Sequence, residues 1–170
     1  MRVFVTGTGR CGTMTFAMAC SWMTNFTSGH ETHRRGTPQS QVNEFPDNHI
    51  EVDAHLFWHM GVLIHRYPEA RWVHLRRNRE DCVKSLMKTS GIRDWMRLAY
   101  TGAGDLRRAC EDYYDSTNQI IGAVLETVWR KRFMHLENLP QEWSGFWEWI
   151  GAEGDYEVSL AELSVRHNQR

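Results

Sequence analysis

The sequence predicts an α/β fold, a three-layer sandwich in which helices cover both faces of a central parallel sheet. Short apolar segments, typical of buried strands, alternate with longer segments whose apolar residues recur every three or four positions, typical of helices. A glycine-rich loop joins the first apolar run to the first helical segment. Strands separated by helices pair in parallel through right-handed crossovers. A chain of 170 residues is expected to form a single domain over 1–170.

Four segments are predicted to be strands of this sheet. The first is the apolar run VFV, and the second, HIEVD, alternates so that Ile50 and Val52 share one face. The segments RWVHL and RFMHL are similarly short and rich in apolar residues. The predicted strands are residues 3–5, 49–53, 71–75 and 132–136.

Five helices are predicted between and after these strands, and their ends carry sequence signals. Asn78 is the predicted N-cap of one helix, with Asp81 three residues later as in a capping box. Pro68 ends the preceding helix because proline disfavours helical geometry in the residue before it. Gly151 is a predicted C-cap. The helices are residues 14–23, 55–66, 79–88, 105–129 and 140–150, followed by a C-terminal tail, 152–170, with a short helix.

The segment 25–48 is polar and contains two prolines, so it is predicted to be a long irregular loop. Long loops in compact domains often cover or bind a ligand. The alternative is a solvated surface loop without a chemical role.

Composition excludes several classes of partner. The formal net charge is −1 with neutral histidines, which gives no net basic field for nucleic acid. The apolar runs are too short to span a bilayer, and the first residues are predicted to be a strand rather than a signal peptide. The four cysteines form no CxxC motif, which favours reduced thiols and a cytoplasmic location.

The glycine-rich loop is the strongest chemical signal in the sequence. Gly7, Gly9 and Gly12 allow backbone N–H groups to approach a phosphate or sulfate at the start of a helix. A Walker A loop would need a lysine after the last glycine, but Thr13 and Met14 follow Gly12. The pattern GxGxxG is present but weak by itself, and a glycine-rich turn without a chemical role is the alternative.

Three stretches together resemble the sulfotransferases that use 3′-phosphoadenosine 5′-phosphosulfate (PAPS). The stretch GRCGTMT, residues 9–15, is similar to the loop that holds the donor's 5′-phosphosulfate. The stretch VHLRRNRED, residues 73–81, is similar to the segment that binds the 3′-phosphate, because Arg77 and Ser85 have the family's spacing. The tripeptide at 54–56, AHL, resembles the segment that carries the catalytic base, and LENL, 136–139, is a weaker match.

The resemblance implies a P-loop NTPase-like sulfotransferase architecture. It also implies transfer of a sulfuryl group from PAPS to a hydroxyl, less likely an amine, of a small-molecule or carbohydrate acceptor. The product nucleotide would be adenosine 3′,5′-bisphosphate (PAP), no metal would be needed, and the loop 25–48 would bind the acceptor. The donor-binding residues implied in this way are Arg10, Cys11, Gly12, Thr13, Met14, Thr15, Arg77 and Ser85.

Two residues are expected to act on the reacting groups. Arg10 would stabilise charge on the leaving oxygen electrostatically, because a guanidinium does not release its proton at ordinary pH. His55 is the expected base for the acceptor hydroxyl, and Glu51 and Asp53, which flank the same strand end, are the alternative bases.

Other roles remain open at this point. Arg77 could form an ordinary ion pair with Glu80 or Asp81. Cys11, at a helix N-terminus, is expected to have a lowered pKa, but as a replacement for serine rather than a nucleophile. His55 could be structural or, with His59, a metal pair, although no third ligand has a suggestive spacing.

Two rival functions follow from the departures from the family pattern. A nucleotide kinase of related fold is one, and the missing Walker lysine opposes it. A non-catalytic nucleotide-binding module is the other, and the unusual residues Cys11, Met14 and Asn78 favour it.

Overall fold

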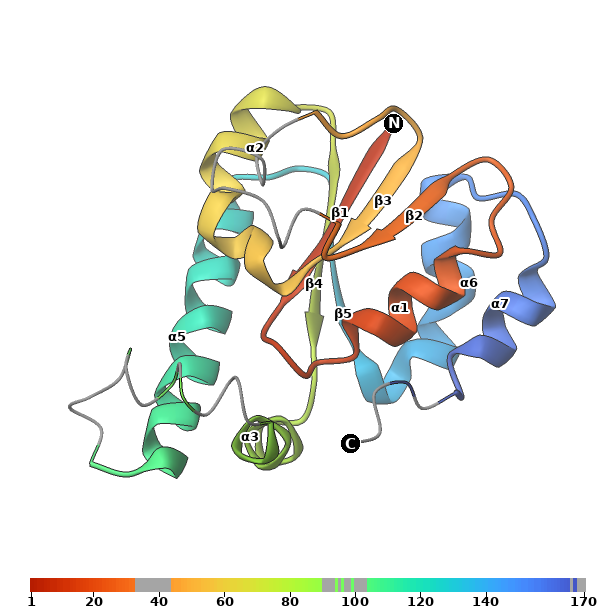
Figure 1. Ribbon diagram of the computed structural model, residues 1–170. Coiled ribbons are helices and arrows are strands. Elements are labelled where there is room, and N and C mark those ends of the chain that lie inside the picture. Colours follow the sequence, from red (N-terminus) through yellow and green to blue (C-terminus); the bar gives the residue numbers. More distant parts are fainter. Residues whose placement is uncertain are drawn as a thin grey trace.

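The computed structural model describes residues 1–32, 44–89, 94, 96, 99, 104–165 and 167. Within these residues a five-stranded parallel sheet, in the order β2-β3-β1-β4-β5, is flanked by helices on both faces (Figure 1). The strands are β1 (Arg2–Gly7), β2 (Thr27–His30), β3 (His49–Val52), β4 (Arg71–Arg76) and β5 (Lys131–His135). The α-helices are α1 (Thr13–Cys20), α2 (Met60–Arg66), α3 (Arg79–Lys88), α5 (Leu106–Glu126), α6 (Leu139–Ile150) and α7 (Tyr156–Glu162), and the 3-10 helices are η2 (Ala54–His59) and η4 (Leu136–Asn138).

The parallel pairing places the loops that follow β1, β3 and β4 at the same edge of the sheet, here called the carboxyl edge. β1 is central: its Val3 is opposite Ile50 of β3 and Arg71 of β4. The carboxyl edge is at the bottom of Figure 1, where α3 also lies. Ligands of open α/β sheets bind at this edge.

Two hydrophobic cores hold the layers together, one on each face of the sheet. On the face covered by α1, α6 and α7, Phe16 packs edge-on against Trp143 and Phe146, with ring centroids 5.1 Å apart in both pairs. On the face covered by α2 and α5, Phe4 packs against Trp72 at 4.9 Å. Strand alternation therefore sends neighbouring residues of β1 into different cores.

The predicted α/β fold with a central parallel sheet is confirmed, and the four predicted strands correspond to β1, β3, β4 and β5 within two residues. Asn78 caps α3 by accepting a hydrogen bond from the Asp81 N–H, and Gly151 ends α6 with a left-handed φ of 68°. The helix predicted over 55–66 begins one residue earlier and as a 3-10 helix, η2, before α2 follows.

The prediction of an irregular loop over 25–48 was wrong for its first part. Thr27–His30 forms β2, the edge strand that pairs in parallel with β3. A strand at the edge of a sheet is only partly covered by other elements, so the residues TSGH need no apolar pattern. The spacing of apolar residues therefore could not identify this strand. Residues 33–43 of the predicted loop lie outside the described part of the chain.

All four cysteines are buried and unpaired. None of the described helices combines the length and the apolar character that a bilayer crossing requires. In the C-terminal tail, Ser159 of α7 makes hydrogen bonds with two other helices. Its Oγ accepts from Trp143 of α6 and donates to the Ala19 carbonyl of α1.

Candidate functional site

The loop between β1 and α1 has the geometry of an anion-binding helix start. Gly12 precedes α1 with a left-handed φ of 97°, no side chain caps the helix, and its first turn holds no acidic residue. The first N–H groups of a helix have no acceptor inside the helix and carry partial positive charge. An anion at Thr13–Thr15 would therefore meet donors without opposing charge.

Two glycines allow this loop to lie against its neighbours. A Cβ on Gly7 would lie 2.1 Å from the Leu75 carbonyl oxygen, and one on Gly12 would lie 2.5 Å from a methyl group of Leu136. Larger residues would push the loop away from β4 and from η4. The glycines thus set how closely the loop approaches β4 and η4.

Arg10, Arg77 and Ser85 form what we call the cationic side of the site. The Arg77 Nη1 donates to the Arg10 carbonyl oxygen at 3.1 Å, and the Arg10 Nε donates to Ser85 Oγ at 3.0 Å. Arg10 has a φ of 67°, a left-handed conformation uncommon outside glycine. Three candidate residues from two separate segments of the sequence are therefore joined by hydrogen bonds.

The alternative in which Arg77 pairs with Glu80 or Asp81 is not observed among the described residues. Glu80 pairs instead with Lys84 at 3.3 Å and with Arg107 at 2.6 Å. The Arg77 Nε is buried and has no hydrogen-bond partner. A buried donor without a partner costs free energy, so the protein leaves part of the hydrogen-bonding capacity of the Arg77 guanidinium unused.

The lowered pKa expected for Cys11 was wrong. Cys11 is completely buried, and this burial, together with the nearby Cys82, raises the pKa of its thiol far above the usual value. Desolvation of the thiolate therefore outweighs the field of the helix start. A raised pKa keeps the thiol neutral, which does not favour a role as nucleophile.

Across the loop, the ends of β2 and β3 bring together His30, Glu31, Asp53 and His55, the histidine–carboxylate side of the site. The buried Asp53 accepts from the His55 backbone N–H at 2.6 Å and lies 2.9 Å from its Nδ1. Because a carboxylate only accepts, Nδ1 carries the proton and the lone pair is on Nε2. This is the tautomer of a general base oriented by a carboxylate.

Glu51, one of the alternative bases, has both carboxylate oxygens engaged in a structural network. Thr32 donates to them through its backbone N–H at 2.9 Å and its hydroxyl at 2.8 Å. His49 Nε2 lies 3.0 Å from the same carboxylate, and its Nδ1 accepts from the Thr27 hydroxyl at 2.8 Å. Glu51 therefore fastens β2 to β3, which leaves Asp53 and His55 as the better placed pair.

His30 lies at the candidate site, although sequence reasoning did not single it out. Its Nε2 lies 3.1 Å from the Thr13 hydroxyl, in the first turn of α1. The contact links β2 to the anion-binding loop across 17 residues of sequence. Only the pairing of β2 with β3 brings His30 to the carboxyl edge, so no local pattern could have identified it.

One group in the described residues has the composition of a metal site. Ligand atoms of Glu31, Asp53 and His55 lie within 4.8 Å of one another. Two carboxylates and an imidazole suit a divalent cation, but Asp53 is already engaged by His55. His59, the predicted partner of His55 in a metal pair, does not belong to this group.

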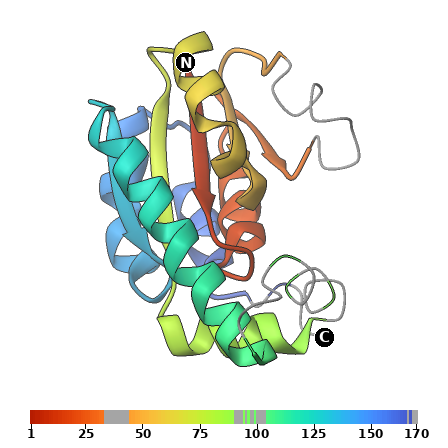
Figure 2. The same cartoon turned by 90° about the vertical axis from the view of Figure 1, so that its left-hand side faces the viewer.

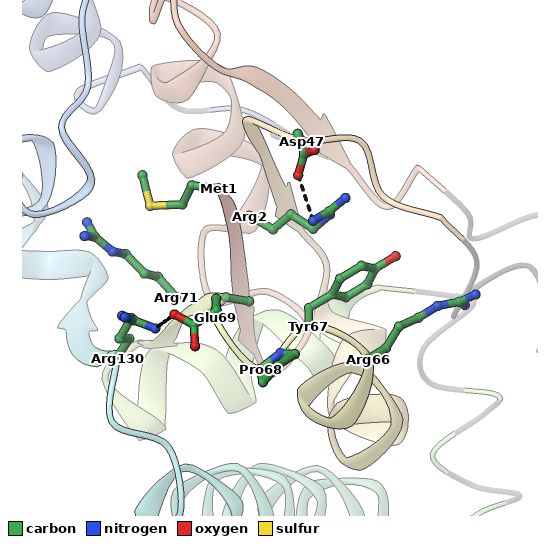
Figure 3. Close-up of a pocket in the computed structure, with 10 residues that line it drawn as sticks. Met1, Arg2, Asp47, Arg66, Tyr67, Pro68, Glu69, Arg71 and Arg130 are labelled. Carbon is green, nitrogen blue, oxygen red and sulfur yellow. Dashed lines mark hydrogen bonds and ion pairs between the residues drawn. The ribbon is translucent and has the colours of Figure 1, made fainter.

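A cavity of about 470 Å³ lies at the opposite edge of the sheet and does not contain the predicted site (Figure 3). It is lined by residues that begin β1 and β4 and precede β5. Two ion pairs border it, Arg2 with Asp47 at 2.8 Å and Arg130 with Glu69. These pairs offset much of its positive charge, and none of the predicted site residues lines it.

Comparison with known proteins gives a likeness in fold. No protein-family model matches the chain, and no curated protein sequence matches it. A solved structure of a sulfotransferase domain from the curacin biosynthetic pathway matches with a TM-score of 0.70 at 10% sequence identity, covering 97% of this chain and 78% of that domain. At this identity the likeness shows that the chain has a sulfotransferase-like fold.

Proposed function

We propose that this chain is a sulfotransferase that moves a sulfuryl group from PAPS to a hydroxyl, less readily an amine, of a small-molecule or carbohydrate acceptor. One observation carries the proposal. Arg10, Arg77 and Ser85, which the resemblance assigns to the two ends of the donor, are joined by two hydrogen bonds beside the start of α1. The sulfotransferase-like fold supports the same conclusion.

The described residues fit a donor that carries two separate anionic groups. The N–H groups at Arg10–Thr15, with the Thr13 and Thr15 hydroxyls, would hold the 5′-phosphosulfate. Arg77, whose buried Nε has no protein partner, and Ser85 would hold the 3′-phosphate. No described carboxylate pairs with Arg77, so the protein itself does not neutralise this cation.

PAPS would supply the sulfuryl group, and the protein would supply position and charge. The acceptor oxygen attacks sulfur as the bond from sulfur to the bridging phosphate oxygen breaks. His55 Nε2 accepts the acceptor's proton, and Asp53 stabilises the resulting imidazolium. The Arg10 guanidinium stabilises the negative charge that develops on the bridging oxygen. This scheme needs no metal ion.

The rival function is a metal-dependent nucleotide kinase. The proximity of Glu31, Asp53 and His55 favours it, because these groups could hold Mg²⁺ next to a phosphate-binding loop. The missing Walker lysine opposes it.

Calorimetric titration tests the proposal. Wild-type protein is titrated with PAP without metal, and with ATP in the presence and absence of Mg²⁺. We expect a preference for PAP, and a loss of PAP affinity of about tenfold or more in Arg77→Ala, because charged hydrogen bonds are lost. A preference for ATP with Mg²⁺ would favour the kinase. PAP binding without turnover on any acceptor of a broad panel would indicate a non-catalytic module.

A further inference from the structure

The long helix α5 contacts both loops that carry the proposed donor site. In Figure 2 it crosses the face of the sheet from one edge to the other and reaches α3 at the carboxyl edge. Of three consecutive residues near its middle, Tyr113 and Tyr114 each contact one of the two loops, and Asp115 contacts Arg79 at the start of α3. A single rigid element therefore touches both ends of the site.

Tyr114 holds the loop after β4. Its hydroxyl donates to the Arg77 carbonyl oxygen at 2.6 Å. Burial raises the pKa of the Tyr114 hydroxyl, with a smaller contribution from Cys82, so the hydroxyl stays protonated and remains a donor. The bond fixes the backbone of the residue whose guanidinium is assigned to the 3′-phosphate.

Tyr113 holds the glycine-rich loop. The Gly9 N–H donates to the Tyr113 hydroxyl oxygen at 3.3 Å, and the Tyr113 side chain is buried. The Gly9 N–H is therefore directed toward the protein, and the donors left to face an anion belong to the following residues. The bond fixes the backbone of the loop that is assigned to the 5′-phosphosulfate.

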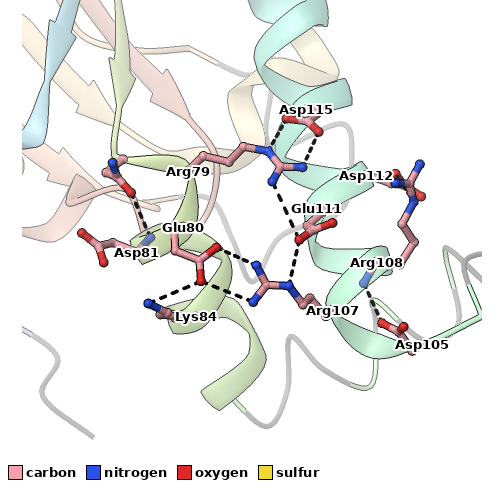
Figure 4. A network of polar contacts seen from close by, with 11 residues as sticks. Arg79, Glu80, Asp81, Lys84, Asp105, Arg107, Arg108, Glu111, Asp112 and Asp115 are labelled. Carbon is pink, nitrogen blue, oxygen red and sulfur yellow. Dashed lines mark hydrogen bonds and ion pairs between the residues drawn. The ribbon is translucent and has the colours of Figure 1, made fainter.

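Ion pairs at the surface hold α3 against the same helix (Figure 4). Asp115 accepts two hydrogen bonds from Arg79, at 2.9 and 2.7 Å, in the first turn of α3. Arg107 of α5 bridges Glu80 and Glu111. Because α3 carries Ser85, these pairs also keep the cationic side in place relative to α5.

We propose that Tyr113 and Tyr114 are positioning residues that set the spacing of the two anion-binding loops, Tyr113 for the 5′ end of the donor nucleotide and Tyr114 for its 3′ end. The inference rests on the proposed function, because it takes PAPS and PAP as the nucleotides. It adds that neighbouring side chains of one helix control the two ends separately. Neither tyrosine is assigned a contact with the nucleotide.

The test compares PAP with adenosine 5′-monophosphate, which lacks the 3′-phosphate. Both are titrated calorimetrically into wild type, Tyr113→Phe and Tyr114→Phe. Each substitution removes one hydroxyl and keeps the ring, so packing is preserved. We expect Tyr114→Phe to weaken PAP binding about threefold to tenfold and to leave the monophosphate unchanged within about twofold. Tyr113→Phe is expected to weaken both nucleotides by the same factor.

The controls separate positioning from general loosening. Tyr156→Phe, on α7 and packed against Trp147, is expected to change neither affinity. Asp115→Asn, at the surface, is expected to act in the same direction as Tyr114→Phe but more weakly. If Tyr114→Phe weakens both nucleotides equally, or neither, the positioning role is overturned. If wild type shows no preference for PAP over the monophosphate, the proposed function itself fails.

Discussion

The two sides of the site are built in different ways. The cationic side comes from the loop after β1, the loop after β4 and the helix α3 that follows it, so its residues lie within the short segments 9–15 and 77–85. The histidine–carboxylate side comes from the ends of β2 and β3, and its contacts join residues far apart in sequence, such as His30 with Thr13. Local backbone geometry positions the first, and long-range pairing positions the second.

This difference suggests that one side of the site binds the donor and the other transfers the proton. The cationic side has a buried donor, the Arg77 Nε, two guanidinium groups and a hydrogen bond from α5, so we expect it to control binding of the donor nucleotide. The histidine–carboxylate side holds an oriented imidazole that is only partly buried, so we expect it to control proton transfer from the acceptor. Variants on the two sides should therefore affect binding and turnover separately.

Arg10→Ala is expected to have the largest effect, because Arg10 belongs to the cationic side but also acts on the leaving group. We expect kcat to fall about a thousandfold, the scale of cationic stabilisation in related phosphoryl transfers. PAP affinity should fall much less. The measurement is steady-state turnover beside PAP calorimetry, and full activity in the variant would refute the assignment.

The packing of β4 against α5, the helix that contacts the cationic side, is expected to make the folded protein less stable in acid. His74 of β4 is fully buried, its Nε2 donates to Asn118 of α5 at 2.8 Å, and its Nδ1 is buried without a partner. Burial, then the charge of Arg76 and more weakly His135, lowers the pKa of His74 to about 4.

In the unfolded chain His74 has an ordinary histidine pKa. Between pH 6.5 and about 4, His74 therefore binds more protons in the unfolded chain than in the folded chain. Stability should fall as the pH falls through this range, by roughly 3 kcal/mol in total. Denaturant unfolding at several pH values measures it. His74→Gln should be less stable at pH 7 but should show a flatter dependence, and equal slopes for both proteins would contradict the prediction.

His55→Ala tests the histidine–carboxylate side. We expect kcat to fall about a hundredfold while PAP affinity stays unchanged, because general base catalysis contributes on this scale. Asp53→Asn should lower kcat in the same direction, since the amide can no longer stabilise the imidazolium. Glu51→Gln is the contrast: it should destabilise the fold at β2 more than it lowers kcat. If His55→Ala leaves kcat unchanged, the base role passes to Asp53.

Sequence reasoning could name Arg10, Arg77 and Ser85 as candidate residues because the signals for the cationic side are local. Glycine spacing, the Asn78 cap and the interval between Arg77 and Ser85 are all visible within one segment. The mutual contact of Arg10 with Ser85 was not visible, because it depends on how α3 packs beside the loop. The fold class could be predicted because strand-like and helix-like apolar segments alternate along the chain, and the spacing of apolar residues indicates which face of each segment is buried.

The rest could not be predicted, because it depends on tertiary pairing. β2 is a polar edge strand, so its residues carry no apolar pattern, and His30 came into the site only with it. The role of Glu51 depends on Thr32 and His49, contacts that no spacing rule identifies. The direction of the Cys11 pKa shift was predicted wrongly. The start of a helix is expected to lower a thiol pKa, whereas the complete burial that raises it becomes visible only in the folded structure.

Ser85→Ala is expected to have the smallest effect and gives the sharpest comparison of the two sides. The Ser85 hydroxyl accepts from the Arg10 Nε, and a hydrogen bond of this kind contributes about 1 kcal/mol, equal to roughly a fivefold loss of PAP affinity. Lys84→Ala, the exposed neighbour on α3, is the matched control and should leave PAP affinity unchanged. If Ser85→Ala lowered kcat with no loss of PAP affinity, Ser85 would act through Arg10 on the leaving group. Binding and turnover could then not be assigned to separate sides of the site.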